Sequence, residues 1–538
     1  MASLEIKNLN LKIGSSQILQ NIDLKIESGQ SVGLVGESGS GKSIASLSVM
    51  GLLPSSAQVS GSIKFDGREL LGLHETEMCK IRGREIAMVF QEPMTALNPV
   101  KTIGDQIAEG LQFHLGLSRA NAQEKVLKLL DQVGLPPAKY APIRFPHELS
   151  GGQRQRVVIA IAIALNPKLL IADEPTTALD VTTQAKVLDL LKQLASEHGS
   201  SLLLITHDLA VVAQMVDHIA VMRDGEIVES GELVRFFRTM KHPYSKRLLA
   251  ASTVKTKVSS QKVSHEIGPS LMRVDRVVKK YKLPRRTVFE APRFLNAVDG
   301  VSFDIAAGES VGLVGESGCG KSTLARTLLA LNKPTSGRVE FLSKDLFALS
   351  RSELRKSRRD MQVVFQDPYG SFNPRHKVGQ LVSEPLHLFK TMSSREKAEH
   401  VGKALIAVGL NAQDSDRYPH EFSGGQRQRI AIARAIITEP KLIVADEPVS
   451  ALDVSIREQV LDLLNDLAER QGLSYLFISH DLHVVRAVTD RVLVMYQGKI
   501  VEQGLTIEVF ENPQHDYTKQ LLAATPHLAE TLLQRAQI

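Results

Sequence analysis

The chain contains two copies of one long sequence pattern, and this internal repeat limits the folds available to it. The segment SVGLVGESGSGKS at residues 31–43 recurs as SVGLVGESGCGKS at residues 310–322. Three shorter segments recur later in the same order: SGGQRQR at 150 and 423, ADEP at 172 and 445, and HDL at 207 and 480. At 538 residues the chain is also too long for a single hydrophobic core. It is therefore predicted to fold as two similar domains.

The landmarks of the repeat define the expected domain limits. We place the first domain at residues 1–250, a linker at 251–270 and the second domain at 271–538. The linker is rich in Ser and Lys and shows no helical period, which is typical of a flexible connection. Each domain is expected to end in a short extension, near 232–250 in the first and 505–538 in the second.

The apolar residues follow the periods of buried strands and of helices. Short apolar runs at 169–172, 202–206 and 476–479 are flanked by turn residues and suit buried parallel strands. Helical spacing appears at 126–133 and at 401–408. Each half is therefore predicted to be an α/β domain with a helical insert.

The glycine-rich segments fit G-x-x-x-x-G-K-[ST], follow a strand-like run and precede a plausible helix, which is the context of a P-loop. Its glycines let backbone N–H groups turn inward on phosphates, while the lysine adds charge and the serine can bind magnesium. The predicted nucleotide-binding residues are Gly36, Glu37, Ser38, Gly39, Ser40, Gly41, Lys42 and Ser43, and Gly315, Glu316, Ser317, Gly318, Cys319, Gly320, Lys321, Ser322 and Thr323. The expected ligands are ATP and Mg²⁺.

An acidic pair follows an apolar strand in each half and supplies the remaining chemistry of ATP hydrolysis. Asp173 and Asp446 are predicted to hold magnesium together with Ser43 and Ser322. Glu174 and Glu447 are predicted to orient and polarise the attacking water.

The order of P-loop, glutamine, SGGQ, Asp-Glu and histidine resembles the ABC ATPase family along nearly the whole chain, twice. The SGGQ signature is the discriminating feature, because most other P-loop folds lack it. The resemblance implies two P-loop NTPase domains in tandem, each with a helical subdomain and a short C-terminal extension. It implies that Gln91 and Gln366 reach magnesium and the lytic water. It also implies that His207 and His480 contact the γ-phosphate and the catalytic glutamate.

In this family each signature faces the P-loop of the partner domain, so the resemblance implies an intramolecular pseudo-dimer with two composite ATP sites. The first site would join the first P-loop to the second signature. The second site would join the second P-loop to the first signature. The signature residues are Ser150, Gly151, Gly152 and Gln153, and Ser423, Gly424, Gly425 and Gln426. The segments at 178–180 and 451–453 resemble D-loops, which touch across that interface.

The two halves differ where the family stacks an aromatic residue on adenine. Tyr281 is well placed for this contact, but the first half has Ile13 at the corresponding position. Either the first site binds the base with less stacking, or an aromatic side chain from elsewhere substitutes. The second half also inserts KLPRRTVFEAPRF at 282–294, before its next strand.

Cysteine usage excludes a disulfide framework and a cysteine-based metal cluster, because the chain has only Cys79 and Cys319. Cys319 lies inside the second P-loop beside Lys321, at a helix start, where thiol pKa values tend to fall. The simpler interpretation is a small residue without a chemical role.

Features outside the catalytic motifs resemble the peptide/nickel class of importers. They are FQEPMTALNP at 90–99 and FQDPYGSFNP at 365–374, in the region that contacts permeases in this family, and HPY at 242–244 with HDY at 515–517. The fused arrangement resembles the ATPase of Yej-type peptide importers, whose cargo includes microcin C. Glutathione or nickel import remains the alternative. This resemblance implies two membrane permease subunits and a periplasmic or extracellular peptide-binding protein as partners.

The expected location is the cytoplasmic face of the inner membrane, as a peripheral subunit, because the longest apolar run, at 157–165, is too short to cross a bilayer. The net charge of +6 comes from 65 basic and 59 acidic residues that are scattered along the chain. We therefore expect no nucleic acid partner. Tandem ABC ATPases that act on ribosomes are a second alternative, but they join their halves by a long charged helix that residues 251–270 do not resemble.

Overall fold

The computed structural model describes residues 2–177, 179–252, 270–283, 292–389, 391–450 and 452–536. The chain divides into two compact units: unit 1 comprises Met1–Thr253 and Pro526–Ile538, and unit 2 comprises Val254–Thr525. Most of the predicted linker and of the insert at 282–294 lies outside the described residues. The domain limits placed from the sequence stay a prediction.

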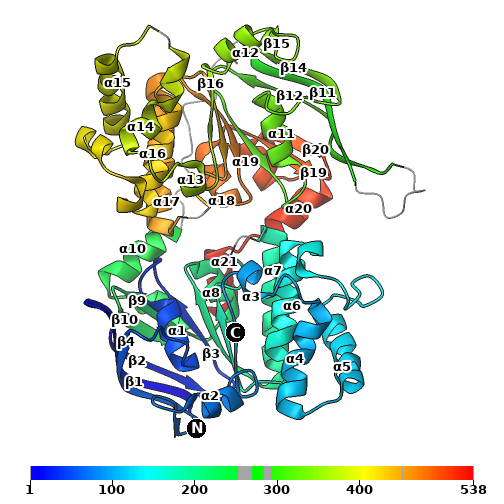
Figure 1. The fold of residues 1–538 in the computed structure, drawn as a ribbon, viewed down its shortest axis with the longest axis vertical. Helices are drawn as coiled ribbons and strands as arrows, with labels where there is room; N and C mark the ends of the chain where they lie inside the picture. Colours follow the sequence, from blue (N-terminus) through cyan, green and yellow to red (C-terminus); the bar gives the residue numbers. More distant parts are fainter. Residues whose placement is uncertain are drawn as a thin grey trace. The chain divides into compact units, whose positions relative to one another are not determined.

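Unit 1 contains two β-sheets (Figure 1). The antiparallel sheet has the strand order β2 (Ser16–Glu27), β1 (Ala2–Ile13), β4 (Ala57–Phe65) and β5 (Arg68–Glu69). The second sheet has the order β10 (Glu226–Glu232), β9 (His218–Arg223), β3 (Ser31–Val35), β8 (Ser201–Thr206), β7 (Leu169–Asp173) and β6 (Ile86–Val89). The strands from β9 to β6 are parallel, and β10 pairs with β9 in antiparallel orientation.

The helices of unit 1 cover the second sheet and form a separate helical subdomain. They are α1 (Lys42–Met50), α2 (Glu75–Ile81), α3 (Pro93–Ala96), α4 (Ile103–Leu115), α5 (Arg119–Gln132), α6 (Gly151–Ile163), α7 (Val181–His198), α8 (Leu209–Met215), α9 (Leu233–Thr239), α10 (Pro243–Ser252) and α21 (Leu528–Ala536), with a 3-10 turn η1 (Pro146–Glu148). In Figure 1, α4, α5 and α6 lie together on one side of unit 1, away from β1, β2 and β4.

Unit 2 repeats the plan of unit 1. Its antiparallel sheet has the order β12 (Phe294–Ala306), β11 (Ser270–Lys282), β14 (Ser336–Phe341) and β15 (Lys344–Asp345). Its second sheet has the order β16 (Met361–Val364), β17 (Leu442–Asp446), β18 (Ser474–Ile478), β13 (Ser310–Val314), β19 (Arg491–Tyr496) and β20 (Lys499–Leu505). The helices are α11 (Lys321–Leu328), α12 (Arg351–Ser357), α13 (Pro368–Ser371), α14 (Val378–Ser383), α15 (Ser394–Ala407), α16 (Gly424–Ile436), α17 (Val454–Gln471), α18 (Leu482–Val488), α19 (Thr506–Glu511) and α20 (Asp516–Ala523), with 3-10 turns η2 (Glu384–Leu388), η3 (Ala412–Asp416) and η4 (Pro419–Glu421).

The parallel strands are continuous apolar runs because both of their faces are buried. On β7, Leu169 and Ile171 pack into the core shared with the antiparallel sheet. Leu170 and Ala172 alternate with them and pack into the core shared with the helices. The strands expected at 169–172, 202–206 and 476–479 and the helices expected at 126–133 and 401–408 are thereby confirmed as β7, β8, β18, α5 and α15.

The last helix of the chain, α21, packs in unit 1 rather than in unit 2. Leu528 is buried in the same core as α8 and α9, and Leu532 packs against that core. Arg535 donates hydrogen bonds to the carbonyls of Val216 and, at 2.9 Å, of Gln214. The chain thus returns to unit 1 after Thr525, a packing that the sequence repeat does not indicate.

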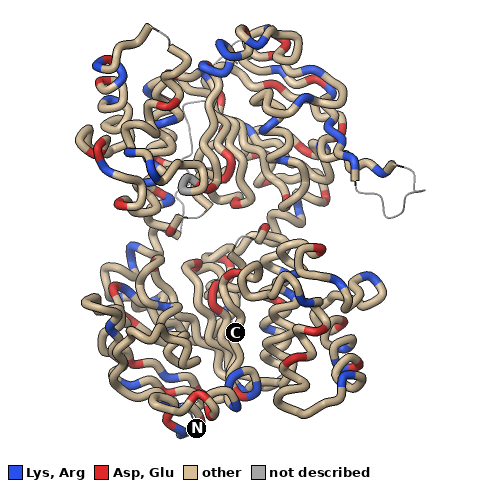
Figure 2. The backbone as a smooth tube through the Cα atoms, viewed as in Figure 1, with Lys and Arg blue, Asp and Glu red and all other residues tan. Residues whose placement is uncertain are grey.

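Charges of both signs are interspersed over each unit (Figure 2), as the scattered basic residues lead one to expect. Within the described part of the chain, no helix is both long enough and apolar enough to cross a membrane.

Candidate functional site

The candidate site of each unit forms where parallel strands of one sheet end. Because the carboxyl ends of parallel strands meet at one edge of the sheet, residues far apart in the sequence converge there. In unit 1 the P-loop follows β3, Asp173 ends β7, His207 follows β8 and Gln91 lies just beyond β6. Unit 2 places Asp446, His480 and Gln366 in the same way.

The P-loop of unit 1 connects β3 to α1 and wraps around its own lysine. Lys42 is only 5% exposed, and its Nζ donates to the carbonyls of Gly36 and Glu37, both at 2.8 Å. A side chain at Gly36 would meet the carbonyl oxygen of Met222 at 2.2 Å, so the strand packing leaves room only for glycine. Gly41 has φ 101°, a conformation that glycine adopts without strain.

The P-loop of unit 2 repeats this geometry between β13 and α11. Lys321 is 6% exposed and donates to the carbonyls of Gly315 at 2.7 Å and Glu316 at 2.8 Å. In both units the lysine ammonium therefore sits inside the loop, with carbonyl oxygens as its partners.

The serine of each P-loop faces the aspartate at the end of the neighbouring strand. Ser43 Oγ donates to Asp173 Oδ1 at 3.1 Å. Burial raises the pKa of Asp173 to about 6, against the opposing hydrogen bond from Ser43. In unit 2, burial likewise raises the pKa of Asp446, with the charge of Glu447 adding to it and Ser322 opposing it. Hydroxyl and carboxylate oxygens are ligands that Mg²⁺ prefers, so this pair fits the expected metal.

The glutamate that follows the aspartate is held by two side chains at once. In unit 1, Gln91 Nε2 donates to Glu174 Oε2 at 3.0 Å, and His207 Nδ1 lies 3.3 Å from Glu174 Oε1. In unit 2, Gln366 Nε2 donates to Glu447 Oε2 at 2.7 Å, and His480 Nδ1 lies 3.0 Å from Glu447 Oε1. The structure thus brings together the glutamine, glutamate and histidine that the sequence singles out, inside each unit.

The environment keeps both glutamates ionised. Burial alone would raise the pKa of Glu174, but the hydrogen bond and charge of His207, together with Thr177, lower it to about 2. The pKa of Glu447 is also lowered, because contact with His480 outweighs burial. Contact with Glu447 raises the pKa of His480 although burial opposes it. An ionised carboxylate is the form that a general base requires.

Both glutamates also have a backbone conformation that is unusual for residues other than glycine. Glu174 has φ 43° and Glu447 has φ 49°. Such residues cost free energy and persist where the surroundings hold them, often at functional sites. The N–H groups of these glutamates donate to the carbonyls of Ile205 and Ile478, both at 2.9 Å, so the end of the neighbouring strand fixes each turn.

The signature serine starts a helix in each unit. Ser150 caps α6: its Oγ accepts from the Gln153 N–H at 3.4 Å, and Gln153 Oε1 accepts from the Ser150 N–H at 3.0 Å. Ser423 and Gln426 cap α16 in the same way. Both glutamines thus form reciprocal capping boxes with the serine. The contact of each signature with nucleotide stays a prediction.

The second glycine of each signature lies against the helix that follows the D-loop. A side chain at Gly152 would meet Thr183 Cγ2 at 2.3 Å, and one at Gly425 would meet Ile456 Cγ2 at 2.3 Å. The predicted D-loops include Ala178 and Ala451, which lie outside the described residues. Asp180, at the end of the first, caps α7 through the Thr183 N–H at 3.0 Å.

The structure places Ile13 and Tyr281 at equivalent points of β1 and β11. Each lies five residues after a position of positive φ, Asn8 at 46° and Arg276 at 43°. Tyr281 is 39% exposed, its hydroxyl accepts from Asn332 Nδ2 at 3.4 Å, and Lys279 Nζ lies 5.4 Å from its ring centre. Ile13 instead packs against the core of unit 1. The two halves therefore differ in side chains at the predicted adenine position.

We expect Tyr281→Ala to weaken ATP binding by roughly tenfold, because stacking of a base on an aromatic ring contributes about 1–3 kcal/mol. Ile13→Ala is the matched change in the first half. It should alter ATP affinity less than about threefold, because an aliphatic side chain contributes less free energy to a contact with the base than an aromatic ring does. Titration with a fluorescent ATP analogue measures both. Equal losses in the two variants would show that Tyr281 does not stack on adenine.

Cys319 lies in the core rather than at the surface of the P-loop. It is 8% exposed and packs in the apolar cluster beneath the loop. Burial raises the pKa of its thiol, and the nearby charge of Lys321 only partly opposes this. The expectation that its position at a helix start lowers the pKa is therefore wrong. Ser40 occupies the same place in unit 1 and is 6% exposed, which fits a small packing residue.

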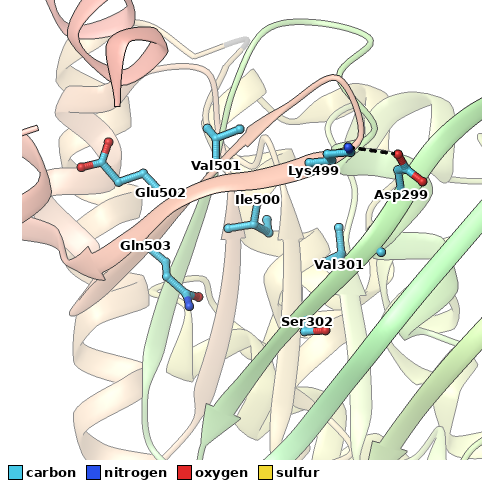
Figure 3. Close-up of a pocket in the computed structure, with 9 residues that line it drawn as sticks. Asp299, Val301, Ser302, Lys499, Ile500, Val501, Glu502 and Gln503 are labelled. Atoms are coloured by element: carbon cyan, nitrogen blue, oxygen red, sulfur yellow. Dashed lines mark ion pairs between the residues drawn. The ribbon is translucent and has the colours of Figure 1, made fainter. Parts of the chain in front are cut away.

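A separate pocket of unit 2, of about 400 Å³, lies between β12 and β20 (Figure 3). Lys499 Nζ and Asp299 Oδ2 form an ion pair at its rim, 3.5 Å apart. Its lining includes none of the P-loop residues. It is therefore distinct from the candidate ATP site.

Sequence reasoning missed three side chains that contact the site. Thr177 donates to Glu174 Oε2 at 2.9 Å. Tyr244 and Tyr517 reach the P-loops from the C-terminal extensions and accept hydrogen bonds from their backbone. The HPY and HDY motifs are the available signal, but by resemblance they indicate the class of transporter and not a contact with the nucleotide site.

Comparison with known proteins identifies the class. The family model for ABC transporters matches residues 19–177 and 298–450, and the model for the oligopeptide/dipeptide transporter C-terminal region matches residues 501–538. The chain belongs to the ABC transporter family and is an ATP-binding ATPase with two such domains in tandem. It acts with a membrane transporter as its ATP-hydrolysing subunit.

Particular relatives match almost the whole chain. The peptidoglycan transport ATP-binding protein YejF of Agrobacterium fabrum is 46% identical over 513 residues, which are 95% of this chain and 93% of the relative. The glutathione import ATP-binding protein GsiA of Escherichia coli is 44% identical over 570 aligned positions, covering 99% of this chain and 91% of the relative. A dimeric ATP-binding cassette solved with ADP and Pi is 32% identical, covers 44% of this chain and 98% of its own, and has a TM-score of 0.39.

Proposed function

We propose that the chain hydrolyses ATP to drive import of peptides or peptide-like compounds through two separate permease subunits, supplied by a peptide-binding protein outside the membrane. The observation that carries this proposal is the match of residues 501–538 to the oligopeptide/dipeptide transporter C-terminal region. The HDY turn of unit 2 lies within that segment, and the HPY turn of unit 1 has the same local structure. The chain would work at the cytoplasmic face of the inner membrane, as a peripheral subunit.

The chemistry assigns one role to each side chain of the site. Ser43 and Asp173, and Ser322 and Asp446, would hold Mg²⁺, with Gln91 and Gln366 as further oxygen ligands. Magnesium, when bound, neutralises developing charge on the phosphates. Glu174 and Glu447 would orient and deprotonate water, and both are ionised for this task.

The histidine and glutamine position the glutamate before ATP arrives. Both carboxylate oxygens of Glu174 already accept hydrogen bonds, so the side chain loses little conformational entropy when it takes up its catalytic orientation. His207 and His480 would then turn between the glutamate and the γ-phosphate, and Gln91 and Gln366 between the glutamate and the metal. The same arrangement in both units supports two hydrolysing sites.

Glutathione is the second candidate cargo, since it is itself a small peptide and a relative of 44% identity is named for its import. Uptake of labelled oligopeptides, dipeptides and glutathione into cells that lack this gene, with and without a plasmid copy, separates the two. Restored uptake of oligopeptides supports the proposal, and restored uptake of glutathione alone favours the second candidate. Co-purification with ribosomes and with no permease would contradict both.

The segment after the first Q-loop offers an exposed apolar surface to a permease. Met94 on α3 is 64% exposed and Val100 is 80% exposed, although such side chains are usually buried. We expect Met94→Glu to lower the amount of chain that co-purifies with membranes by roughly tenfold, because a charge in an apolar contact is costly. Ile406→Glu is the control, since Ile406 is 63% exposed on α15. Equal losses in both variants would contradict a contact at Met94.

A further inference from the structure

The HPY turn of unit 1 and the HDY turn of unit 2 each place a buried tyrosine against a P-loop. Tyr244 is 4% exposed, and its hydroxyl accepts a hydrogen bond from the Glu37 N–H at 3.0 Å. Tyr517 is 6% exposed, and its hydroxyl accepts from the Glu316 N–H at 2.9 Å. The contact thus occurs twice, once in each unit, between segments about 200 residues apart in the chain.

Each turn is anchored to the last strand of its own sheet. In unit 1, the carboxylate of Glu229 on β10 accepts from the N–H groups of Lys241 at 2.7 Å and His242 at 3.2 Å. The ring of His242 then accepts from the Tyr244 N–H at 3.3 Å, which orients the start of α10. A series of hydrogen bonds that begins at Glu229 on β10 therefore positions the tyrosine beside the P-loop.

Unit 2 has the same anchor. Glu502 on β20 accepts from the N–H groups of Gln514 at 2.7 Å and His515 at 3.0 Å, and the His515 ring accepts from the Tyr517 N–H at 3.1 Å. Figure 3 shows Glu502 on the opposite side of the strand from Ile500, and both residues line the separate pocket. The ring of Tyr517 packs on Tyr496, with centroids 4.2 Å apart.

The tyrosine hydroxyl binds the same P-loop residue whose carbonyl accepts a hydrogen bond from the lysine. Glu37 gives its N–H to Tyr244, while its carbonyl accepts from Lys42 Nζ at 2.8 Å. Glu316 is held in the same two ways, by Tyr517 and by Lys321. When the lysine turns to phosphate, the tyrosine still holds the N–H of this residue, while its carbonyl keeps the turn bond from the Ser40 N–H at 3.2 Å in unit 1 and from the Cys319 N–H at 3.3 Å in unit 2.

We propose that Tyr244 and Tyr517 are positioning residues for ATP: each holds the second residue of its P-loop so that the loop is already shaped for phosphate. The HPY and HDY motifs then serve the nucleotide site of their own unit, whatever cargo the transporter carries. This inference rests on ATP binding alone and goes beyond the proposed import of peptides. A preorganised loop binds more tightly because it loses less conformational freedom on binding.

The test removes each hydroxyl and keeps the ring. Tyr244→Phe is made in a Lys321→Ala background, so that nucleotide binding reports the first P-loop, and Tyr517→Phe is made with Lys42→Ala for the second. We expect the Kd for a fluorescent ATP analogue to rise roughly fivefold to tenfold in each case, as loss of one buried hydrogen bond implies. Glu229→Gln, which weakens the anchor but leaves the hydroxyl, should raise Kd in the same direction by less.

Tyr475→Phe is the matched control for loss of a buried hydroxyl. Tyr475 is 3% exposed on β18, and its hydroxyl has no hydrogen-bond partner among the described residues. Its removal should leave Kd unchanged. A Tyr244→Phe variant that lowers the melting temperature but binds ATP with the unaltered Kd would show that the tyrosine only supports the fold, and would overturn the proposal.

Hydrogen exchange provides a readout that needs no nucleotide. Amide exchange across residues 31–43 should accelerate roughly threefold or more in Tyr244→Phe, and across residues 310–322 in Tyr517→Phe, with the other P-loop unaffected. Unchanged exchange in both P-loops, or equal acceleration throughout the chain, would count against the assignment. If the tyrosine variants show the expected changes in Kd and in amide exchange but the protein does not restore peptide uptake, only the proposed cargo is contradicted.

Discussion

Replacing Glu174 or Glu447 by glutamine is expected to lower steady-state ATP turnover at least tenfold in each single variant. General-base groups typically contribute about 10²–10⁴ to the rate, and glutamine has the shape of glutamate but cannot take a proton from water. Both carboxylates are ionised and held by glutamine and histidine, so each site has the geometry of a working base. Release of phosphate at saturating ATP measures the effect.

ATP affinity in these variants provides the internal check, because the substitution should leave binding within a factor of about 3 while turnover falls. Glu458→Gln, at an exposed position of α17, is the control for a neutralised carboxylate. Full turnover in Glu174→Gln or in Glu447→Gln would show that the altered site does not contribute to hydrolysis. A difference in turnover between Glu174→Gln and Glu447→Gln would show that the two sites contribute unequally to hydrolysis.

Replacing Lys42 or Lys321 by alanine is expected to weaken ATP binding at the altered site by roughly 100-fold. Each lysine ammonium is buried inside its loop and carries the charge that phosphate needs, and hydrogen bonds to charged groups contribute about 1.5–3 kcal/mol each. Equilibrium titration with a fluorescent ATP analogue should show one tight site instead of two.

Lys168→Ala is the control for loss of a positive charge, because Lys168 forms a surface ion pair with Asp66 at 2.8 Å and is 61% exposed. Two tight sites in Lys42→Ala or in Lys321→Ala would mean that its ammonium does not reach the phosphates. The melting temperature of each variant without nucleotide separates loss of binding from loss of folding.

Most of the fold could be predicted because its signals are local. The continuous apolar run of β7, which is buried on both faces, and the helical period of α5 can be read from a few consecutive residues. The repeat then transfers each assignment from one half to the other. Helix α21 had no such support, because its partners Val216 and Gln214 are distant in the sequence.

The candidate site also has a part that local sequence motifs predict and a part that depends on contacts between distant residues. Lys42, Asp173 and Glu174 lie in motifs whose spacing indicates their chemistry, and the structure brings them to one edge of the sheet. The sequence does not show that burial would raise the pKa of the Cys319 thiol, because neighbours from other elements decide burial. The sequence does not show the tyrosine contacts for the same reason, since the partner of Tyr244 is the backbone N–H of Glu37, which lies far away in the chain.

The sequence by itself determined that the chain is a tandem ATPase, since motifs that bind phosphate, polarise water and start a helix depend on adjacent residues. Tertiary structure decided how those motifs are supported: which side chains hold Glu174 and Glu447, where α21 packs, and that Tyr244 and Tyr517 reach the P-loops. These contacts join residues far apart in the chain, and only the folded sheet, with the carboxyl ends of its strands at one edge, brings them within hydrogen-bonding distance.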